Sequence, residues 1–272
     1  MLVEYDVIRF DLFNRTFESL KNATVLEEVV SAYINGDFYA SFHCLPTQLK
    51  ELIVGHLLTE DIIEDVKNIA SIEVSGKNIH VKLHDNIPFV SKGQRLITTF
   101  CSGSNIRRHL SEKAHKLRSN KTKFLVEVVF KAVEVLNSFS SIHRASRGSH
   151  SAVLVDGNGN AISFSEDVGR HNAIDKVIGD AALKGIDLTK LLLASTGRLT
   201  SEIVIKASQV GIPILVSLAA PTSLGVSIAN DLGLTLVGLV GRRCFNIYTL
   251  PERIEGTEEW RDIYEKVHVS KS

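Results

Sequence analysis

The second half of the chain alternates short apolar segments with segments of helical length, and this alternation limits the fold more than any other feature. The run Asp156-Gly157-Asn158-Gly159-Asn160 separates two strand-like segments and predicts a β-hairpin over residues 151–164. Further strands are predicted at residues 191–194, 213–218 and 235–240, with helices at residues 172–185, 200–210 and 223–232. Strands that are connected through helices pair in parallel by right-handed crossovers. The pattern therefore predicts an α/β fold with a mixed sheet and helices on both faces.

The helix predicted at residues 172–185 has one apolar face and begins in a polar cluster. Its apolar residues recur at helical spacing and are Ile174, Val177, Ile178, Ala181 and Ala182. Asn172 is the candidate N-cap, and Gly185 is the candidate end of the helix. The polar cluster consists of Glu166, Asp167, Arg170, His171 and Asn172. It lies where unpaired N–H groups of a helix N-terminus attract anions, although an ordinary capped helix with a surface ion pair explains the same residues.

Three loops follow the predicted parallel strands, at residues 195–198, 219–222 and 241–243. Ligands of such sheets bind at the carboxyl ends of the strands. The first two loops lead into helices, and together the three loops offer arginines and backbone N–H groups. The sequence therefore predicts a nucleotide or phosphate pocket at this edge, with well-capped ordinary loops as the alternative.

The first half of the chain predicts a small α+β domain. Asn35-Gly36 is a turn signal that predicts a hairpin over residues 33–42, and a second hairpin is predicted over residues 69–83. Between them, Pro46 is expected to open a helix. His43-Cys44 could form half of a metal site, but no paired ligand lies at a suitable spacing, so ordinary packing is the alternative.

Residues 86–105 lack sustained periodicity and predict a connecting loop. Cys101 lies in this loop between small polar residues, where a partner could reach its thiol. Arg107 and Arg108 follow closely enough to favour the thiolate if the chain folds back. A cysteine that fills a small apolar pocket is the alternative. Two helical patterns follow, a strongly basic one at residues 105–117 and an amphipathic one at residues 123–136.

The composition excludes several classes of protein. The chain has 272 residues, of which 44% are hydrophobic, and a net charge of +0, so it is long enough for one large or two smaller domains. The balanced charge predicts neither nucleic-acid nor membrane binding. The N-terminal sequence contains acidic residues and no uninterrupted apolar core, so a signal peptide is not expected. The chain has only 3 cysteines, an odd number that does not suit a disulfide framework. This favours a reducing compartment, so we expect a cytoplasmic protein.

Several catalytic motifs are missing from the sequence. There is no G-x-x-x-x-G-K-[ST] phosphate loop, and Gly157-Asn158-Gly159 belongs to a hairpin, which rules out a dinucleotide-binding fingerprint. The H-x-E and P-C-x-x-C zinc signature of nucleobase deaminases is also missing, so neither a metal site nor a hydrolytic deaminase is expected.

Several longer motifs occur in a characteristic order. They are INGDFYASFHCLPTQLKELIVGHLLTEDII, SEDVGRHNAIDKVIG, STGRLTSEIVIKASQVGIPILVSLAAPTSLGVSIANDLGLTLVG and FNIYT. Together they resemble the FdhD/NarQ family of formate dehydrogenase accessory proteins, from about Val25 to Thr249. The resemblance implies a cytosolic, typically dimeric sulfur carrier. Such a protein takes persulfide sulfur from a cysteine desulfurase and passes it to the molybdenum of bis(molybdopterin guanine dinucleotide), before that cofactor enters formate dehydrogenase.

The resemblance also assigns a domain organisation. It implies a small N-terminal domain at residues 1–97, a loop and helix bearing the cysteine at residues 98–122, and a cytidine-deaminase-like domain without zinc at residues 123–272. The last domain would bind the cofactor, and GDP or GMP would occupy the sites for its guanine nucleotide ends.

The family's C-x-x-C loop falls on Cys101-Ser102-Gly103-Ser104, so that the first cysteine is kept and Ser104 replaces the second. One thiolate is sufficient to attack a persulfide and hold its sulfur, because each exchange step needs a single nucleophile. A second cysteine could resolve or relay the sulfur. The alternative function is therefore a cofactor-binding chaperone that lacks sulfur transfer.

The family's cofactor-binding segment falls on Leu239-Val240-Gly241-Arg242-Arg243-Cys244, where its glycines and arginines are permuted. The guanidinium groups of Arg242 and Arg243 would bind the cofactor's phosphates. Cys244 could handle sulfur as well, with inert packing as the alternative.

The resemblance also places His171, with Asp167 and Arg170 beside it, in the cofactor cavity. We expect these three residues to hydrogen-bond pterin or guanine edges. Gly148-Ser149-His150 matches a Gly-His element of the family and is a weaker candidate of the same kind.

Overall fold

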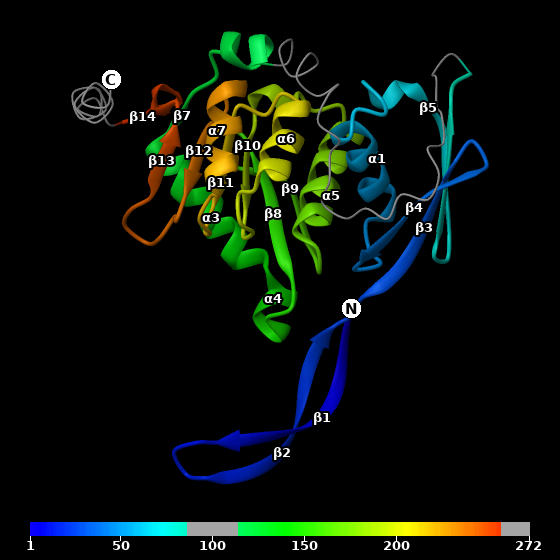
Figure 1. The fold of residues 1–272 in the computed structure, drawn as a ribbon, viewed down its shortest axis with the longest axis vertical. Coiled ribbons are helices and arrows are strands. Elements are labelled where there is room, and N and C mark those ends of the chain that lie inside the picture. The colour runs from blue at the N-terminus through cyan, green and yellow to red at the C-terminus, as the bar shows by residue number, and fades with distance from the viewer. Residues whose placement is uncertain (86–113, 257–272) are drawn as a thin grey trace.

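The computed structural model describes residues 1–85 and 114–256. These residues form a domain around a six-stranded sheet, a smaller domain around a four-stranded sheet, and a long N-terminal hairpin (Figure 1). Residues 114–119 are helical, at the end of the predicted basic helix, and the rest of that helix lies outside the described residues. No described helix is long and apolar enough to cross a membrane.

The larger sheet is mixed, as predicted. Its strands are β8 (His150–Val155), β9 (Ala161–Asp167), β10 (Leu192–Ser195), β11 (Ile214–Ser217), β12 (Thr235–Gly238) and β13 (Asn246–Thr249). They lie in the order β13-β12-β11-β10-β8-β9, with β10, β11 and β12 parallel and the other pairings antiparallel. β12 ends before the predicted residue 240 because Leu239 adopts a left-handed backbone with a φ of 54°. β13 was not predicted.

Helices cover both faces of this sheet. One face packs on α5 (Arg170–Leu183), α6 (Ser201–Gln209) and α7 (Ser223–Leu232), and the other on α3 (Val126–Phe139). Strand side chains alternate between the faces. In β10, for example, Leu193 belongs to the apolar core of the first face and Ala194 to that of the second.

The start of α5 differs from the prediction, whereas its end agrees with it. The N-cap position is Gly169 and not Asn172, which lies in the first turn. The Asn172 amide instead donates to Asp167 Oδ1 at 3.0 Å and to the His43 carbonyl at 2.8 Å. Gly185, with a φ of 69°, follows the helix, as expected from the freedom of glycine in this conformation.

The smaller domain contains the two predicted hairpins and one helix. Its elements are β3 (Glu28–Ile34), β4 (Asp37–Cys44), α1 (Leu49–Thr59), β5 (Ile69–Ser75) and β6 (Asn78–Leu83), with the strand order β4-β3-β6-β5. The helix starts at Leu49 and not at Pro46, because residues 46–48 form a turn in which Gln48 has a φ of 52°. The predicted domain boundaries at residues 97 and 122 stay predictions, since residue 97 lies outside the described residues.

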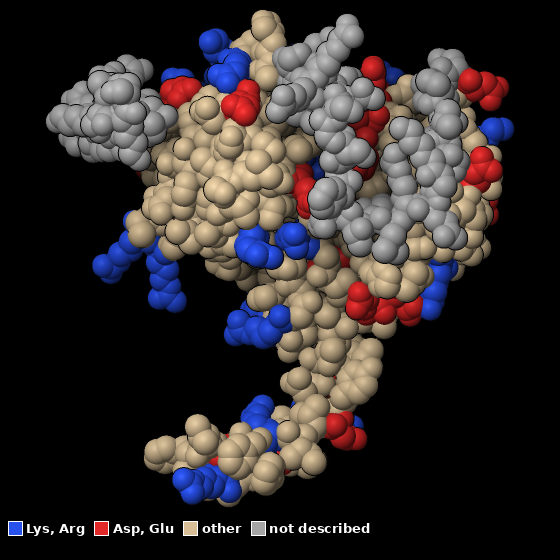
Figure 2. Space-filling model, viewed as in Figure 1, with Lys and Arg blue, Asp and Glu red and all other residues tan. Residues whose placement is uncertain are grey.

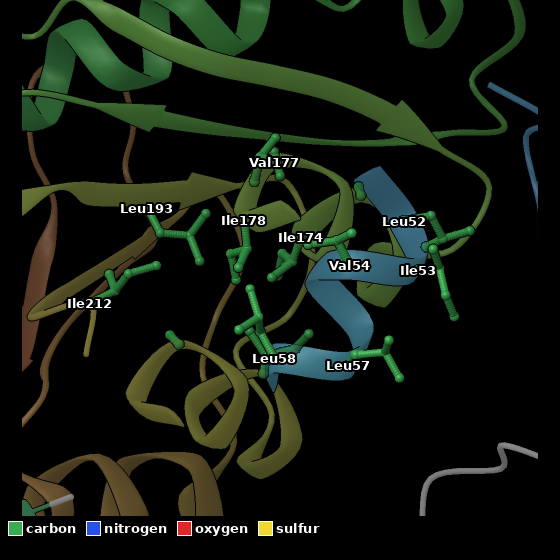
Figure 3. Packing of buried hydrophobic residues seen from close by; sticks show 14 of the residues in the cluster. Leu52, Ile53, Val54, Leu57, Leu58, Ile174, Val177, Ile178, Leu193 and Ile212 are labelled. Atoms are coloured by element: carbon green, nitrogen blue, oxygen red, sulfur yellow. The ribbon is translucent and has the colours of Figure 1, made fainter. Parts of the chain in front are cut away.

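α1 joins the two domains by packing on α5, and we call this contact the α1–α5 seam. Apolar side chains of both helices share one core (Figure 3). The backbones approach so closely that a Cβ atom at Gly55 would overlap the carbonyl of Asp175, and one at Gly179 would overlap the carbonyl of Glu51. Only glycine permits this approach at both positions.

Two further strands, β1 (Leu2–Asp11) and β2 (Thr16–Val25), form a hairpin that was not predicted and that extends away from both domains (Figure 1). The remaining short elements are 3-10 helices at Val66–Asn68, Leu188–Lys190 and Pro251–Arg253, the helix α4 (Ser141–Ser146), and the strands β7 (Phe124–Leu125) and β14 (Ile254–Glu255).

Candidate functional site

The candidate site lies at the edge formed by the carboxyl ends of β10, β11 and β12, at the bottom of the sheet in Figure 1. Backbone hydrogen bonds connect the three loops that follow these strands. The Leu199 N–H donates to the Ala220 carbonyl at 3.3 Å, and the Thr222 N–H donates to the Leu199 carbonyl at 3.1 Å. The Leu239 N–H donates to the Ala219 carbonyl at 3.2 Å. The structure thus brings together the three predicted loops.

The N-terminus of α5 meets the loop after β10 at the same edge. Arg170 packs on Gly197 so closely that a Cβ atom on Gly197 would lie 2.9 Å from that of Arg170. His171 Nε2 lies 3.5 Å from the carboxylate of Glu202, in the first turn of α6. The first turns of α5 and α6 are therefore neighbours. Because helix N-termini carry unpaired N–H groups and a partial positive charge, this arrangement favours an anionic ligand.

Four buried polar atoms at this edge have no hydrogen-bond partner among the described residues. They are Ser195 Oγ, Thr200 Oγ1, Arg170 Nε and His171 Nε2. The 3.5 Å separation between His171 and Glu202 is too long for a good hydrogen bond. Leaving a buried polar group unpaired costs about 1–3 kcal/mol, so such groups are rare in native proteins. Four of the seven such atoms among the described residues lie at this edge, which favours it as a candidate ligand site.

Both histidines at the edge are mainly neutral at neutral pH. Burial lowers the pKa of His171 to about 4, and the charges of Lys206 and Arg170 act in the same direction. Burial and the charge of Arg170 also lower the pKa of His150, whose Nδ1 lies 3.2 Å from Thr196 Oγ1. A neutral imidazole can both donate and accept a hydrogen bond. These side chains therefore suit the edge of an uncharged heterocycle.

Asp167, which was predicted to contact the cofactor, is fully buried beneath the edge. Its carboxylate lies 2.6 Å from Lys176 Nζ and accepts hydrogen bonds from the N–H groups of Leu45 at 3.1 Å and Gly169 at 2.9 Å. Lys176 Nζ also donates to the Leu45 carbonyl at 2.9 Å. Asp167 thereby fixes the start of α5 against the end of β4. In this conformation it can act on a ligand only by positioning the first residues of α5.

The predicted cofactor-binding segment Leu239–Cys244 follows β12 and forms a turn. The Gly241 N–H donates to the Cys244 carbonyl at 2.9 Å. Arg242, Arg243 and Cys244 are all exposed. Figure 2 shows positively charged side chains projecting from this corner of the molecule. Adjacent strands are about 4.8 Å apart, so this segment lies roughly 10 Å from the loop after β10.

The two residues that open this segment behave differently. The side chain of Val240 belongs to the apolar core and is 3% exposed, so it cannot bind a ligand. Leu239 is 46% exposed and has a φ of 54°. A left-handed backbone costs a residue other than glycine about 1–3 kcal/mol and is often found at functional sites.

The cysteines differ in accessibility. Cys101, the predicted persulfide carrier, lies outside the described residues. Cys44 is fully buried, and burial raises the pKa of its thiol to about 12, so it is unreactive. Cys244 is free and exposed.

The predicted half of a metal site, His43-Cys44, gains no further ligand. His43 pairs with Glu27 at 3.5 Å, and the described part of the chain contains no group of three potential metal ligands.

Sequence analysis did not select Thr200, Glu202 or Lys206 as site residues. Lys206 is 6% exposed, and its Nζ lies 3.0 Å from Asp175 Oδ2 and 2.9 Å from Glu60 Oε1. Its position three residues after Ile203, on the apolar face of the predicted helix, was the available signal. A lysine at such a position requires a buried partner.

Comparisons with known proteins agree with the resemblance. The sequence profile of the FdhD/NarQ family matches residues 25–255. Two relatives are each named Sulfur carrier protein FdhD. The one from Staphylococcus aureus (strain MRSA252) is 32% identical over 266 residues, covering 93% of this chain and 96% of that protein. The one from Staphylococcus haemolyticus (strain JCSC1435) is 32% identical over 239 residues, covering 86% and 90%.

A solved structure is also similar to this one. It is the crystal structure of a proposed formate dehydrogenase accessory protein from Desulfotalea psychrophila, with a TM-score of 0.76, 25% sequence identity, and coverage of 93% of this chain and 99% of that chain. Family profile, relatives and fold agree over nearly the whole length of the chain. The chain therefore belongs to the FdhD/NarQ family.

Proposed function

We propose that this protein carries sulfur as a persulfide on Cys101 and transfers it to the molybdenum of bis(molybdopterin guanine dinucleotide), before that cofactor enters formate dehydrogenase. The observation that carries the proposal is that relatives matching 93% and 86% of the chain are named sulfur carrier proteins. The similarity to a proposed formate dehydrogenase accessory protein supports the target enzyme.

The loading step requires no reagent beyond the sulfur donor. The thiolate of Cys101 attacks the terminal sulfur of a persulfide on a cysteine desulfurase. The bond between the two donor sulfurs breaks, and the donor cysteine leaves as a thiolate. The numbers of atoms and electrons are conserved in this exchange. In the delivery step Cys101 would leave as a thiolate, and the sulfane sulfur would take up two electrons from the reduced metal to become its sulfido ligand. The buried Cys44 thiol cannot replace it, since its pKa is about 12.

The cofactor would bind at the carboxyl edge of the six-stranded sheet. Arg170 and His171, at the start of α5, have unpaired atoms that suit a pterin or guanine edge. Arg242 and Arg243 would contact phosphates roughly 10 Å away, which is within the length of a dinucleotide. GDP or GMP would then occupy part of the same site. The bound metal centre would be the acceptor of the sulfur, and the protein would supply its binding and orientation.

The first experiment is persulfide loading. Incubation with a cysteine desulfurase and free cysteine should add one sulfur atom to Cys101, detected by mass spectrometry. Cys101→Ser should abolish the addition, and Cys44→Ser should not. Loading that persists in Cys101→Ser would contradict the assignment. A protein that binds the cofactor but is never loaded would instead be a chaperone without sulfur transfer, an alternative favoured by Ser104 at the position of the second family cysteine.

The second experiment separates the cofactor site from the thiol. His171→Ala should weaken GDP binding at least tenfold, which corresponds to about 1.4 kcal/mol, because a hydrogen-bonding group facing the ligand is lost. Loading of Cys101 should be unchanged. Calorimetric titration with GDP measures the first effect, and unchanged binding would remove His171 from the site.

Further properties follow from the family resemblance and belong to the same proposal. They are a cytidine-deaminase-like character of the larger domain, a cytoplasmic location, association with a cysteine desulfurase and with formate dehydrogenase, and a homodimeric state. The mixed sheet with helices on both faces supports the first of them.

A further inference from the structure

Two pairs of polar side chains connect α5 with α6. His171 and Asp175 lie four residues apart on α5, so they share one side of that helix. Glu202 and Lys206 have the same spacing on α6. His171 Nε2 lies 3.5 Å from Glu202 Oε2, and we call these two residues the outer pair. Lys206 Nζ lies 3.0 Å from Asp175 Oδ2, one helical turn further from the sheet edge, and we call these the inner pair.

The inner pair is fully hydrogen-bonded. Both side chains are almost completely buried. Lys206 Nζ also donates to Thr59 Oγ1 at 2.8 Å and lies 2.9 Å from Glu60 Oε1, at the end of α1. Because buried charges are tolerated only when they are paired and hydrogen-bonded, these contacts fix α5 and α6 against each other and against α1. The inner pair therefore holds the outer pair in a defined position at the sheet edge.

The outer pair is incomplete. Its side chains are 26% and 23% exposed, and their separation of 3.5 Å exceeds the usual range of about 2.7–3.2 Å. Burial lowers the pKa of His171 to about 4, so the imidazole is uncharged at neutral pH and does not neutralise Glu202. Among the described residues, only His171 lies within ion-pair distance of the Glu202 carboxylate. A carboxylate has about four acceptor sites, so most of the acceptor capacity of Glu202 is open to a ligand.

The N-cap of α6 leaves a second polar group open beside Glu202. Thr200 Oγ1 does not cap the helix and has no partner among the described residues. At the same position of α7, Thr222 Oγ1 accepts from the Gly225 N–H at 3.1 Å, as a threonine N-cap usually does. Both open groups at the start of α6 can accept hydrogen bonds. A ligand with adjacent N–H donors would therefore complete them.

We propose that Glu202 determines which heterocycle binds at this edge, by accepting two hydrogen bonds from a ring N–H and from the amino group beside it. Guanine carries this pair of donors on its Watson–Crick edge, and so does the pterin ring of the proposed cofactor. The two oxygens of a carboxylate match two parallel donors in bidentate geometry. Adenine and hypoxanthine each lack one donor of the pair and are rejected. The inference rests on the proposed cofactor site and names the residue that recognises the ring.

The charge of Glu202 also sets the orientation of a bound nucleotide. A carboxylate repels phosphate groups, whereas the exposed guanidinium groups of Arg242 and Arg243 attract them. The base therefore lies at the starts of α5 and α6, and the phosphates lie toward the turn after β12. The separation of roughly 10 Å between these two places suits a nucleotide in this orientation.

Calorimetric titration of the full chain tests the proposal. The ligands are GDP, inosine diphosphate, which lacks only the amino group, and xanthosine diphosphate, in which an oxygen replaces that group. The wild type should bind GDP at least about tenfold more tightly than inosine diphosphate. Glu202→Gln keeps the size of the side chain but replaces one acceptor by a donor. It should weaken GDP binding at least about tenfold, remove most of the preference over inosine diphosphate, and strengthen xanthosine diphosphate relative to GDP.

Glu127→Gln is the matched control. Glu127 also lies in the first turn of a helix, where an acidic side chain favours the helix dipole, but that helix is α3, on the other face of the sheet. This variant should bind all three nucleotides like the wild type. A preference for GDP over inosine diphosphate that is unchanged in Glu202→Gln would overturn the role of Glu202 alone. A wild type that does not bind GDP would overturn the proposed cofactor site and this inference with it.

A further titration distinguishes the two sources of the recognised edge. The compound 6-hydroxymethylpterin carries the same pair of donors without ribose or phosphate. If the edge takes the pterin end of the cofactor, this compound should bind to the wild type and bind more weakly to Glu202→Gln. Binding of GDP without binding of the pterin would assign the edge to the guanine end. Persulfide loading of Cys101 should be the same in Glu202→Gln and in the wild type, because the substitution leaves the thiol chemistry unchanged.

Discussion

The α1–α5 seam and the carboxyl edge of the six-stranded sheet share one helix, but they treat buried polar groups in opposite ways. In the seam, the Asp175 carboxylate accepts from Thr59 Oγ1 at 2.8 Å and from Lys206 at 3.0 Å, and His56 Nδ1 lies 3.3 Å from it. At the sheet edge, four buried polar atoms lack partners among the described residues. Satisfied polar groups fix a structure, whereas unsatisfied ones are retained where a ligand completes them.

The pKa values of the buried ionisable groups also differ between the seam and the edge. Although burial alone would raise the pKa of Asp175, Lys206 and His56 lower it to about 2, so the carboxylate stays charged and paired. At the edge, burial lowers the pKa of His171 to about 4, and the charges of Lys206 and Arg170 outweigh the opposing effect of Asp175 and Glu60, so the imidazole is neutral. In the seam Asp175 thus keeps its charge, whereas at the edge His171 is uncharged. This difference predicts that substitutions in the seam mainly affect stability, while those at the edge mainly affect binding.

The largest loss of stability is expected from Asp167→Ala. Lys176 is 0% exposed, and without the carboxylate its charge would be buried unpaired, which costs about 3–5 kcal/mol. Lys123→Ala is the control, since it breaks the Lys123–Glu255 pair, in which both side chains are 50% exposed, and should cost less than about 1 kcal/mol. Urea unfolding measures both. Equal losses in the two variants would show that Asp167 is not a structural residue.

The next largest loss is expected from Gly179→Ala. The added methyl group would overlap the Glu51 carbonyl, and since backbone cannot rotate away, α1 and α5 must separate at a cost of about 3 kcal/mol. Gly157→Ala adds the same methyl group where no atom lies within 4 Å and should change the free energy of unfolding by less than about 0.5 kcal/mol. If both variants unfold at the same urea concentration, the two helices are not in direct backbone contact.

A pH dependence is expected from His171. Its pKa is lowered from 6.5 to about 4 in the folded state, so the unfolded chain takes up a proton first as the pH falls. The contribution of the neutral imidazole is complete above pH 6.5 and is lost as the pH falls toward 4. Between pH 7 and pH 5, His171→Gln should therefore lose about 2 kcal/mol less stability than the wild type. Parallel stability profiles for the two proteins would show that the imidazole titrates normally.

The fold of the larger domain could be predicted because its strand and helix periods are clear. The prediction failed where the backbone adopts an unusual conformation, as at Leu239 and Gln48, or where a distant group binds the candidate cap, as the His43 carbonyl binds the Asn172 amide. The N-terminal hairpin, β1 and β2, could not be predicted as a separate element. Leu2 to Phe10 mixes apolar and charged residues on both faces, so no alternation of period two identifies a buried side.

The location of the candidate site in the fold could be predicted in part, whereas its binding role stays a prediction. Arg170 and His171 lie at the predicted edge, since a strand-to-helix connection places them there. Asp167 was expected beside them and is buried below, because its partners Leu45 and Lys176 come from segments that sequence spacing cannot relate. Lys206 lies on the apolar face of α6. From the sequence alone it could equally be a surface lysine, because its partner Asp175 comes from another helix. Local patterns thus locate the edge, and tertiary contacts decide which polar residues remain free for a ligand.

The smallest structural effect, and the sharpest contrast between the two regions, is expected from the cysteines. Cys44, at the end of β4, lies in the apolar core that contains the seam, where it is 0% exposed and burial raises its thiol pKa to about 12, whereas Cys244 lies exposed at the edge. In a Cys101→Ser background, a thiol reagent should modify Cys244 at least about a hundredfold faster than Cys44, which reacts only when the seam opens. Cys244→Ser should change the free energy of unfolding by less than about 0.5 kcal/mol. Mass spectrometry of the labelled peptides gives both rates. Comparable rates would mean that the seam opens readily, and then the contrast between a closed region and an open edge would not hold.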